Sequence, residues 1–449
     1  MIGAERALEM AETALGVDGA DEVEVTLYSE SGGLTRFADS VIHQHTERSD
    51  AQIKIRVVTG KRSASASTNR LDDDTAIVRT GRRALEMARL SPPDDLFPGL
   101  PGDFGATRLA PAEEAERFDG ATAAATPGWR ADRVAEAVKA AGDRPVAGFF
   151  STSADEVALA NTNGIRRHAT FTVAAFTCMV RSGDGTAHHE SVARRAADIP
   201  VVAVTEDLAH WADRGRAAGD LKPGAYPVVL MPLAVGEMLE MLAFMGFGAK
   251  DLLNGESFFV DRQGKAVGSP IVNIVDDVAH PMSLGPAFDL EGVWRQRVAI
   301  IDRGVANQPV YDTRTAAEAG TTTTGHASGS QEYGPYPANL HIAPGDQTTD
   351  DLVAGIERGL LVRRFWYVNV VNQRETVLTG MTRDGLFLIE DGAVTKPVHN
   401  LRFTQSVLDS LGGCSGIGAD LACLSSGGGA LLAPALRLDA FNFTSATSH

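Results

Sequence analysis

Two segments near the start of the chain alternate strictly between apolar and polar residues, and they constrain the fold more than any other feature. They are Asp21–Tyr28 (DEVEVTLY) and Ala51–Val58 (AQIKIRVV). Alternation with a period of two places the apolar side chains on one face, so each segment is predicted to be a half-buried strand. A turn signal at 59–61 follows, and Arg62–Thr68 is predicted to return antiparallel to the second strand. The chain should therefore begin with an antiparallel sheet.

Helical periodicity flanks these strands. Apolar residues recur at helical spacing in Glu5–Leu15 and Thr75–Leu90, and the second helix should end before the prolines at 92–93. Further helices are predicted at Ala131–Ala141 and Asp207–Gly219. The other predicted elements of this half are strands at Leu34–Ala38, Val41–Gln44, Val146–Ser153, Glu156–Asn161 and Ile165–Val180, a loop at Asp184–His189, and a long irregular connection at Pro93–Gly128.

The character of the sequence changes after Lys222-Pro223-Gly224. Glycine and proline become frequent and the predicted strands shorten. Helices are predicted only at Pro232–Phe247 and Thr349–Gly359. We therefore predict an α+β fold. Its N-terminal α/β domain, residues 1–220, has antiparallel sheets and flanking helices, with candidate subdomains at 1–92 and 110–220 that are compatible with an internal duplication. Its C-terminal domain, residues 221–449, is mainly β with few helices.

The composition excludes several classes of protein. The formal net charge of −17 disfavours contact with nucleic-acid phosphates. Three cysteines, Cys178, Cys414 and Cys423, are too few and too scattered for a disulfide framework. No run reaches the roughly 18 apolar residues of a membrane span, and the first residues lack the basic-then-apolar order of a signal peptide. We expect a chain in a reducing cytoplasm that binds neither nucleic acid nor membrane.

Three short motifs invite a catalytic interpretation, and each has a structural alternative. His188-His189-Glu190 lacks a second histidine four residues on, where Ala193 stands, so a polar loop is favoured over a metal site. The glycine-rich segment Gly412–Gly418 holds Cys414, a conceivable nucleophile, but a tight structural turn is favoured. The two carboxylates of Phe288–Gly292 fit an ordinary turn better than an acid–base pair.

A polar loop of small residues is the best candidate for a substrate groove. It comprises TTTTGH and SGSQEYGPYP, at 321–326 and 328–337. Backbone groups and hydroxyls in such loops can hydrogen-bond an extended chain, although an exposed linker is an equal alternative. The residues predicted to line the groove are Thr324, His326, Tyr333 and Tyr336.

The apolar run Tyr226–Met231 is predicted to be a buried strand that leads directly into the helix Pro232–Phe247. Such a junction is a common place for an active site. The helix carries two carboxylates, Glu237 and Glu240, but no histidine, cysteine or obvious nucleophile.

Several blocks of the sequence together resemble the TldD/PmbA family, long labelled modulators of DNA gyrase. The resemblance extends over nearly the whole chain, in the order of the family. The blocks are Val57–Arg70 with the helix end Ala88–Pro92, Phe288–Gly292 with the strand Ile300–Val305, Asn339–Asp346 with Arg358–Leu360, and the C-terminal strands around Arg383–Phe387, Ile389-Glu390, Gly392, Pro397-Val398 and Arg402-Phe403.

The resemblance implies a zinc metallopeptidase made of two kinds of subunit. The TldD-type subunit carries H-E-x-x-x-H on a helix, and the TldE/PmbA-type subunit lacks these histidines. In this chain the matching helix reads GEMLEM, so Gly236 and Met241 stand where the histidines belong, and Glu237 remains. Glycine offers no ligand and a thioether is a poor one for zinc, so this helix resembles a metal helix with its ligands replaced.

We therefore expect a TldE/PmbA-like chain with no catalytic residue and no metal of its own. It would form a heterodimer with a TldD-like partner that carries H-E-x-x-x-H and zinc, and a homodimer in isolation is also compatible. The pair would hydrolyse amide bonds in peptides or peptide-like natural-product intermediates. The alternatives are a self-sufficient amide hydrolase that uses Cys414 or the Glu237/Glu240 pair, and a non-enzymatic regulatory binding protein.

Overall fold

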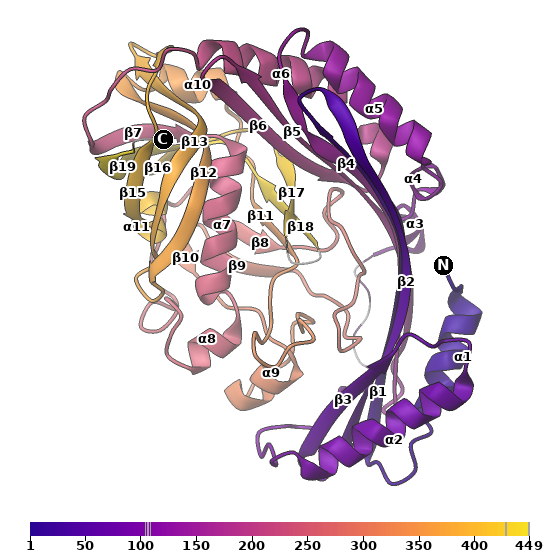
Figure 1. Ribbon diagram of the computed structural model, residues 1–449. Coiled ribbons are helices and arrows are strands. Elements are labelled where there is room, and N and C mark those ends of the chain that lie inside the picture. The colour runs from indigo at the N-terminus through magenta and orange to yellow at the C-terminus, as the bar shows by residue number, and fades with distance from the viewer. Residues whose placement is uncertain (104, 106, 108, 427–428, 448–449) are drawn as a thin grey trace.

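The computed structural model describes residues 1–103, 105, 107, 109–426 and 429–447. A long curved sheet from the N-terminal half wraps around the C-terminal half, which holds a second sheet and a barrel (Figure 1). Strands of the first sheet lie within residues 22–193 and those of the other two within residues 224–446. This arrangement confirms the predicted α+β class, while the exact domain limits stay a prediction.

The N-terminal sheet is antiparallel throughout, in the order β3-β2-β1-β4-β5-β6. The predicted short strands Leu34–Ala38 and Val41–Gln44 are the far ends of two much longer strands. The loop predicted at Asp184–His189 is wrong, because those residues lie mostly in β6. The strands are β1 (Glu22–Ala38), β2 (Val41–Thr59), β3 (Arg62–Thr68), β4 (Val146–Asn161), β5 (Arg166–Ser182) and β6 (Gly185–Ala193).

Helices cover the convex face of this sheet (Figure 1). The apolar face of β1, formed by Val23, Val25 and Leu27, packs in one core with α1 and α2. The segment predicted as an irregular connection contains two short helices, and the helix predicted at Asp207–Gly219 begins and ends earlier. The helices are α1 (Ala4–Leu15), α2 (Asp74–Leu90), α3 (Pro111–Ala115), α4 (Gly120–Ala123), α5 (Pro127–Ala140), η1 (Ala196–Asp198) and α6 (Val201–Arg214).

The C-terminal half contains a six-stranded sheet and a closed barrel. The sheet has the order β10-β9-β8-β11-β18-β17, and the barrel closes because β12 pairs with both β7 and β13. The sheet strands are β8 (Ile274–Asp276), β9 (Val298–Asp302), β10 (Val305–Ala306), β11 (Asn339–Ile342), β17 (Ala422–Ser426) and β18 (Gly429–Ala433). The barrel strands are β7 (Gly224–Leu230), β12 (Arg358–Asn372), β13 (Val377–Glu390), β15 (Leu401–Ser406) and β19 (Leu436–Ala446), with β14 (Ala393–Pro397) and β16 (Cys414–Ile417) attached.

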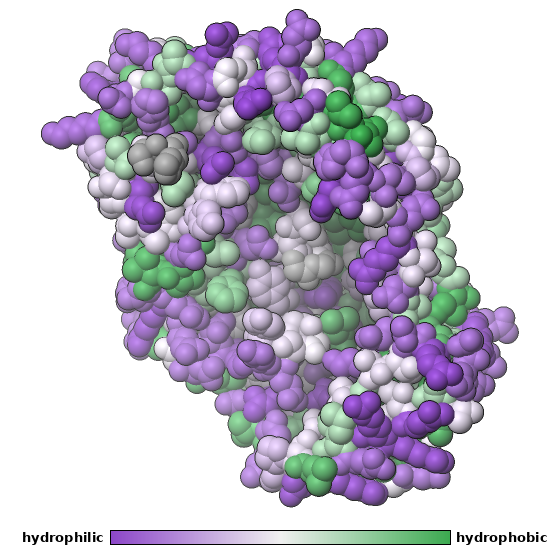
Figure 2. Space-filling model, in the orientation of Figure 1, coloured by the Kyte–Doolittle hydropathy of each residue, from purple (hydrophilic) through white to green (hydrophobic). Residues whose placement is uncertain are grey.

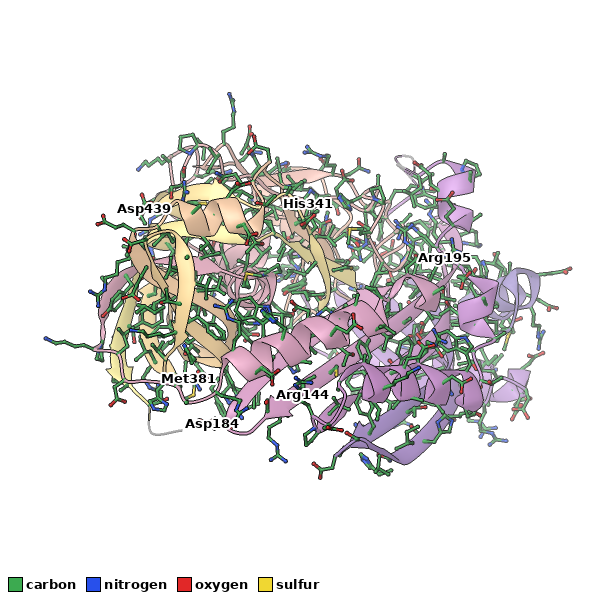
Figure 3. The ribbon with its side chains drawn as sticks, turned by 90° about the horizontal axis from the view of Figure 1, so that it is seen from above. Arg144, Asp184, Arg195, His341, Met381 and Asp439 are labelled. Carbon is green, nitrogen blue, oxygen red and sulfur yellow. The ribbon has the colours of Figure 1, made fainter. Side chains whose placement is uncertain are left out.

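The helix α7 (Pro232–Gly246) packs between the barrel and the second sheet, with contacts to β12 and β18. Seen from above, His341 of this sheet lies between Asp439 on the barrel side and Arg195 on the side of the N-terminal sheet (Figure 3). The sequence predicted only two helices here, and the second ends earlier than expected because β12 begins at Arg358. The remaining helices are α8 (Ala249–Leu253), α9 (Thr313–Ala319), α10 (Thr349–Ala354) and α11 (Val407–Gly412).

In the part of the chain that the structure describes, every helix is too short or too polar to cross a lipid bilayer.

Candidate functional site

A cavity of about 820 Å³ lies between the concave face of the N-terminal sheet and the loops of the C-terminal half. The surface is hollowed in the space-filling view, and hydrophilic and hydrophobic residues are mixed around the hollow (Figure 2). We call this cavity the chamber. Its walls come from β1 to β5 on one side, and on the other from the turn around Leu290, the start of α9, the loop 327–331 and the ends of β17 and β18.

The polar side of the alternating strands faces the chamber. In β1 the chamber-facing residues are Glu24, Thr26, Tyr28 and Glu30, one residue out of step with the apolar set under the helices. The same rule holds in β2, where Gln52, Lys54 and Arg56 face inward. Successive side chains of a strand point to opposite faces, so the alternation that predicted the strands also determines the chemistry of the chamber wall.

The carboxylate of Glu24 is a buried polar group with one unpaired oxygen. Only 7% of the residue is exposed. Its Oε1 lies 3.8 Å from a guanidinium nitrogen of Arg56, and its Oε2 has no hydrogen-bond partner. Burial raises the pKa of Glu24 to about 7, against the lowering effect of Arg56. An unpaired buried acceptor is costly, so this atom marks a place where a donor would be favourable.

The turn Phe288–Gly292 is seated against the N-terminal sheet at the same place. Asp289 is fully buried and accepts hydrogen bonds from the backbone N–H groups of Glu291, Val293 and Ala327, so its role in the turn is structural. Glu291 lines the chamber, and burial raises its pKa to about 7, with Asp289 as the next cause. Asp289 therefore fits the predicted ordinary turn, because it holds the backbone of the turn. Glu291 differs, because its side chain lines the chamber.

At the first expected ligand position of α7, any side chain would require Leu424 to move. A Cβ placed on Gly236 would lie 2.3 Å from Cδ1 of Leu424 and 3.4 Å from Cδ2 of Leu431. This side of the helix is therefore packed against β17 and β18. At the second position, Met241 is partly buried against the main hydrophobic core.

The two carboxylates of α7 lie three residues apart and so share one side of the helix. Burial raises the pKa of Glu237, and Glu240 raises it further while Arg364 opposes the rise. Burial also raises the pKa of Glu240, with a further rise from Glu190 of β6. These groups form an acidic patch between α7 and the edge of the N-terminal sheet, and none of the three lines the chamber.

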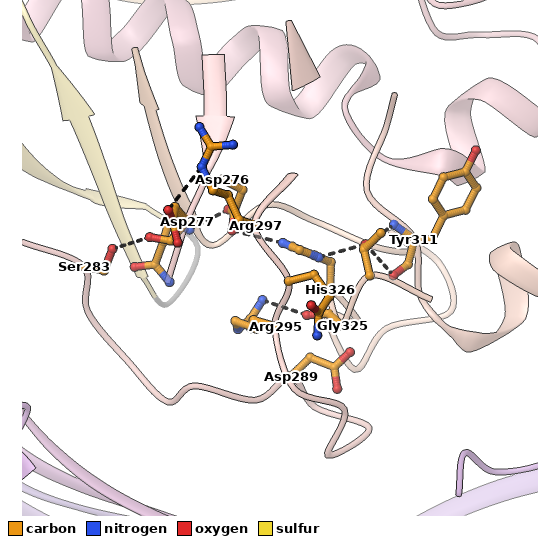
Figure 4. Close-up of polar contacts among 12 residues, drawn as sticks. Asp276, Asp277, Ser283, Asp289, Arg295, Arg297, Tyr311, Gly325 and His326 are labelled. Carbon is orange, nitrogen blue, oxygen red and sulfur yellow. Dashed lines mark hydrogen bonds and ion pairs between the residues drawn. The ribbon is translucent and has the colours of Figure 1, made fainter. Parts of the chain in front are cut away.

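The predicted groove residues lie partly in the interior and partly on the outside of the molecule, and not in the chamber wall. His326 is fully buried, its Nε2 lies 3.0 Å from Oδ1 of Asp276, and its Nδ1 lies 2.9 Å from Oγ1 of Thr324 (Figure 4). Tyr333 is 65% exposed, and burial raises the pKa of Tyr336 to about 12. None of these four side chains lines the chamber, whereas the intervening residues 327–331 and Gly334 do.

The remaining reactive side chains are buried in the framework. Burial raises the pKa of Cys414 to about 11 and that of Cys423 to about 12. The segment around Cys414 is a helix end followed by β16, not the favoured tight turn. His188 and His189 are neighbours in β6, so they point to opposite faces, and burial lowers the pKa of each to about 4.

Among the residues that the structure describes, no three His, Cys, Asp or Glu side chains are grouped so that they could hold a metal ion. Sequence reasoning missed the chamber-facing acids and bases of the N-terminal sheet altogether. The signal was present, since Glu24 of DEVEVTLY and Lys54 and Arg56 of AQIKIRVV lie in the chamber wall. It was not recognised because the polar face of a half-buried strand usually faces water.

Two family models match the chain. The model described as the PmbA/TldA metallopeptidase C-terminal domain matches residues 223–445, and the one described as PmbA/TldA metallopeptidase domain 1 matches residues 23–88. Together they cover well over half of the chain.

Curated relatives carry corresponding names. A metalloprotease of Methanothermobacter thermautotrophicus is 24% identical over 201 residues, which are 44% of this chain and 43% of that protein. A zinc metalloprotease TldD homolog of Saccharolobus solfataricus is 27% identical over 215 residues, 46% of each chain. These matches span less than half of the length of those relatives. Metalloprotease PmbA of Escherichia coli O157:H7 is 23% identical over 448 residues, 95% of this chain and 94% of that protein.

Solved structures share the fold over the full length. The crystal structure of TldE from Thermococcus kodakarensis matches with a TM-score of 0.86 at 20% identity, and covers 98% of this chain and 99% of the other. A structure from Thermotoga maritima matches with a TM-score of 0.83 at 18% identity, over 98% of this chain and 99% of the other. At this level of identity the likeness establishes the fold only.

Proposed function

Because the chain belongs to the PmbA/TldD metallopeptidase family, we propose that it is a TldE/PmbA-type subunit that works with a TldD-like partner. The pair would hydrolyse amide bonds in peptides or peptide-like intermediates. This chain would enclose the substrate and bind it, and the partner would carry the metal ligands and the activating glutamate.

One observation carries this proposal, namely the packing of α7 where a metal helix would present its ligands. The Cβ position of Gly236 is occupied by Leu424, so even a methyl group there would displace a core side chain. Met241 offers a thioether, which is a poor ligand for zinc. A catalytic zinc site needs three protein ligands, and the residues present on this helix do not fit that ion. We therefore derive no catalytic step through a metal on this chain.

The chamber supports a role in binding a peptide. Its wall offers hydroxyls and charges from the N-terminal sheet, and the loop 327–331 lies opposite. In addition, β17 is the last strand of its sheet among the described residues, and Ser425 on it lines the chamber. This strand contacts β6 of the N-terminal sheet, so an extended chain would bind through the side chains and backbone groups that these walls present to the chamber. Enclosure also excludes water, which strengthens polar contacts to the bound chain.

The test is reconstitution. The purified chain, a TldD-like chain with H-E-x-x-x-H, and their mixture are compared for bound zinc and for hydrolysis of a fluorogenic peptide amide. We expect zinc in the partner only, and much greater hydrolysis in the mixture than in this chain alone. Stoichiometric zinc in this chain, or full activity without the partner, would overturn the proposal.

A self-sufficient hydrolase remains a second candidate because of Glu237 and Glu240, whose raised pKa values suit acid–base chemistry. It predicts hydrolysis by this chain alone that is abolished by Glu240→Gln. Cys414 is a weaker candidate, since its thiol is buried and its pKa is raised to about 11. Co-purification with a topoisomerase, and not with a TldD-like chain, would instead favour the regulatory binding protein.

A further inference from the structure

We propose that the chamber contains a subsite for a cationic group of the bound peptide, formed by the carboxylates of Glu24 and Glu291. The group is an ammonium, carried either by a lysine side chain or by the amino terminus of the peptide. This inference rests on the proposed function, because it takes the chamber to be the place where the peptide lies. To that function it adds the chemical class of the group that the chamber binds, which is an ammonium.

The first observation is the unpaired oxygen of Glu24. The residue is more than nine-tenths buried, lines the chamber, and leaves Oε2 without a hydrogen-bond partner. Its ion pair with Arg56 is long, at 3.8 Å, and Arg56 also lies over the ring of Phe97, 5.0 Å from the ring centroid. Oε2 is itself buried, but the residue lines the chamber, so a rotation of the side chain would bring this acceptor to a donor supplied by a ligand.

The second observation is that the turn Phe288–Gly292, which belongs to the opposite wall, brings Glu291 close to Glu24. Gly292, with φ of 78°, seats the turn on the N-terminal sheet, because a Cβ there would lie 2.6 Å from Cγ2 of Ile165 and 2.7 Å from Cδ2 of Leu159. Asp289 holds the turn in place by accepting hydrogen bonds from the backbone N–H groups of Glu291 and Val293. Glu291 accepts a hydrogen bond of 3.1 Å from the N–H of Thr313. Its negative charge also raises the pKa of Glu24, so the two carboxylates are electrostatic neighbours.

The charges around this pair favour an organic cation over a metal ion. Lys54 and Arg56 lie on the adjacent strand and lower the pKa of Glu24, which moderates the negative potential but leaves Oε2 free. Asp312, on the other side, raises the pKa of Glu291. No metal-holding cluster of three ligands occurs among the described residues, and an ammonium needs only acceptors for its three N–H donors.

Isothermal titration calorimetry on the full chain tests the subsite. The probes are a capped alanine tetrapeptide with one lysine and the same peptide with norleucine in its place. A third probe, an alanine tetrapeptide amide with a free amino terminus, is compared with its acetylated form. A preference for lysine or for the free amino terminus identifies the source of the ammonium. We expect one of the two cationic probes to bind about tenfold more tightly than its neutral twin.

Variants assign the preference to the two carboxylates. Glu24→Gln and Glu291→Gln should each reduce it to about twofold or less, since glutamine keeps the shape and an acceptor but removes the charge. The control Glu9→Gln removes one charge from α1, on the opposite side of the sheet, and should leave the preference unchanged. Circular dichroism and thermal unfolding check that each variant is folded.

The inference is overturned if the charged and neutral probes bind equally, if none binds, or if both variants keep the full preference. The experiments distinguish failure of this inference from failure of the proposed function. Hydrolysis by the reconstituted pair without any cation preference would remove the subsite and leave the function. A cation preference without hydrolysis by the pair would leave the subsite and remove the function.

Discussion

The buried carboxylate of Glu24 should lower the stability of the folded chain at neutral pH, and Glu24→Gln should restore it. The pKa of Glu24 is about 7 in the folded chain, against an ordinary value of 4.5, and the largest cause is burial. At about 1.4 kcal/mol per pKa unit, the difference corresponds to about 3 kcal/mol of unfolding free energy. The pKa difference converts to a free energy of unfolding without a discount for solvent screening, because Glu24 is 93% buried.

The sign follows from proton linkage. Below about pH 4.5, Glu24 is protonated in both the folded and the unfolded chain, so its charge costs nothing. As the pH rises towards 7, the unfolded chain loses the proton first, and the folded state becomes relatively less stable. Glutamine is neutral throughout. The stability of Glu24→Gln relative to the wild type should therefore grow over this interval and level off at about 3 kcal/mol above pH 7.

Urea denaturation followed by circular dichroism, at several values between about pH 5 and pH 8, measures this difference. The control is Glu9→Gln, which removes an exposed carboxylate with 64% of its side chain accessible. Its stability relative to the wild type should change little with pH. A difference for Glu24→Gln that is constant across the range would refute the reasoning, as would a variant less stable than the wild type at pH 8.

Three further predictions concern the framework. Gly236→His should destabilise the chain by about 3 kcal/mol or more, because the imidazole overpacks the contact with Leu424. In the Leu424→Ala background, urea denaturation should show a smaller loss of stability for the same change. Equal losses in both backgrounds would contradict the packing argument. Asp276→Ala removes the carboxylate that pairs with Nε2 of the buried His326, while Thr324 remains at Nδ1, and should cost about 1–3 kcal/mol; an unchanged free energy of unfolding in urea would count against it. Iodoacetamide should not label Cys414 in the folded protein, because its thiol is buried and its pKa is raised to about 11, and rapid labelling seen by mass spectrometry would disprove this.

The alternation of apolar and polar residues predicted much of the N-terminal sheet. It did not predict the full length of β1, where two glycines are needed for packing. The pair Gly32-Gly33 interrupts the apolar pattern, so the end of β1 was predicted as a separate strand. In the structure β1 continues through this pair. A Cβ on Gly32 would lie 2.6 Å from the carbonyl oxygen of Thr152, and one on Gly33 would lie 2.1 Å from the guanidinium of Arg130. These glycines allow a close approach and do not mark a turn, which only the tertiary contacts reveal.

The missed strand β6 has a different cause. The turn between β5 and β6 consists of two residues, Gly183 and Asp184, and the positive φ of 59° at Gly183 suits a tight hairpin. The run SGDGT was therefore a usable hairpin signal. The strand that follows it is polar, and residues such as Ala187 are its buried members, so the apolar alternation that marks the other strands is weak here.

The candidate site required the tertiary structure for a similar reason. The resemblance implies that α7 is a metal helix with its ligands replaced, which stays a prediction, and the structure adds that a side chain at Gly236 would require Leu424 to move. The sequence did not identify the chamber, because the charged residues of β1 face another part of the chain and not solvent. The wrapping of the Phe288–Gly292 turn over that face converts a solvated strand surface into an enclosed one.

That enclosure gives the chamber a charge different from that of the whole molecule. The chain carries a net charge of −17, yet the Asp and Glu residues lining the chamber are matched in number by its Lys and Arg residues, five of each. Because the pKa values of Glu24 and Glu291 are both about 7, the chamber becomes more negative as the pH rises through neutrality, while the acidic surface stays ionised. A cationic peptide is therefore attracted by the surface first, and is held in the chamber by carboxylates that ionise more readily in its presence. The acidic members are Glu24, Glu30, Asp155, Glu291 and Asp312, and the basic members are Lys54, Arg56, Lys250, Arg295 and Arg314.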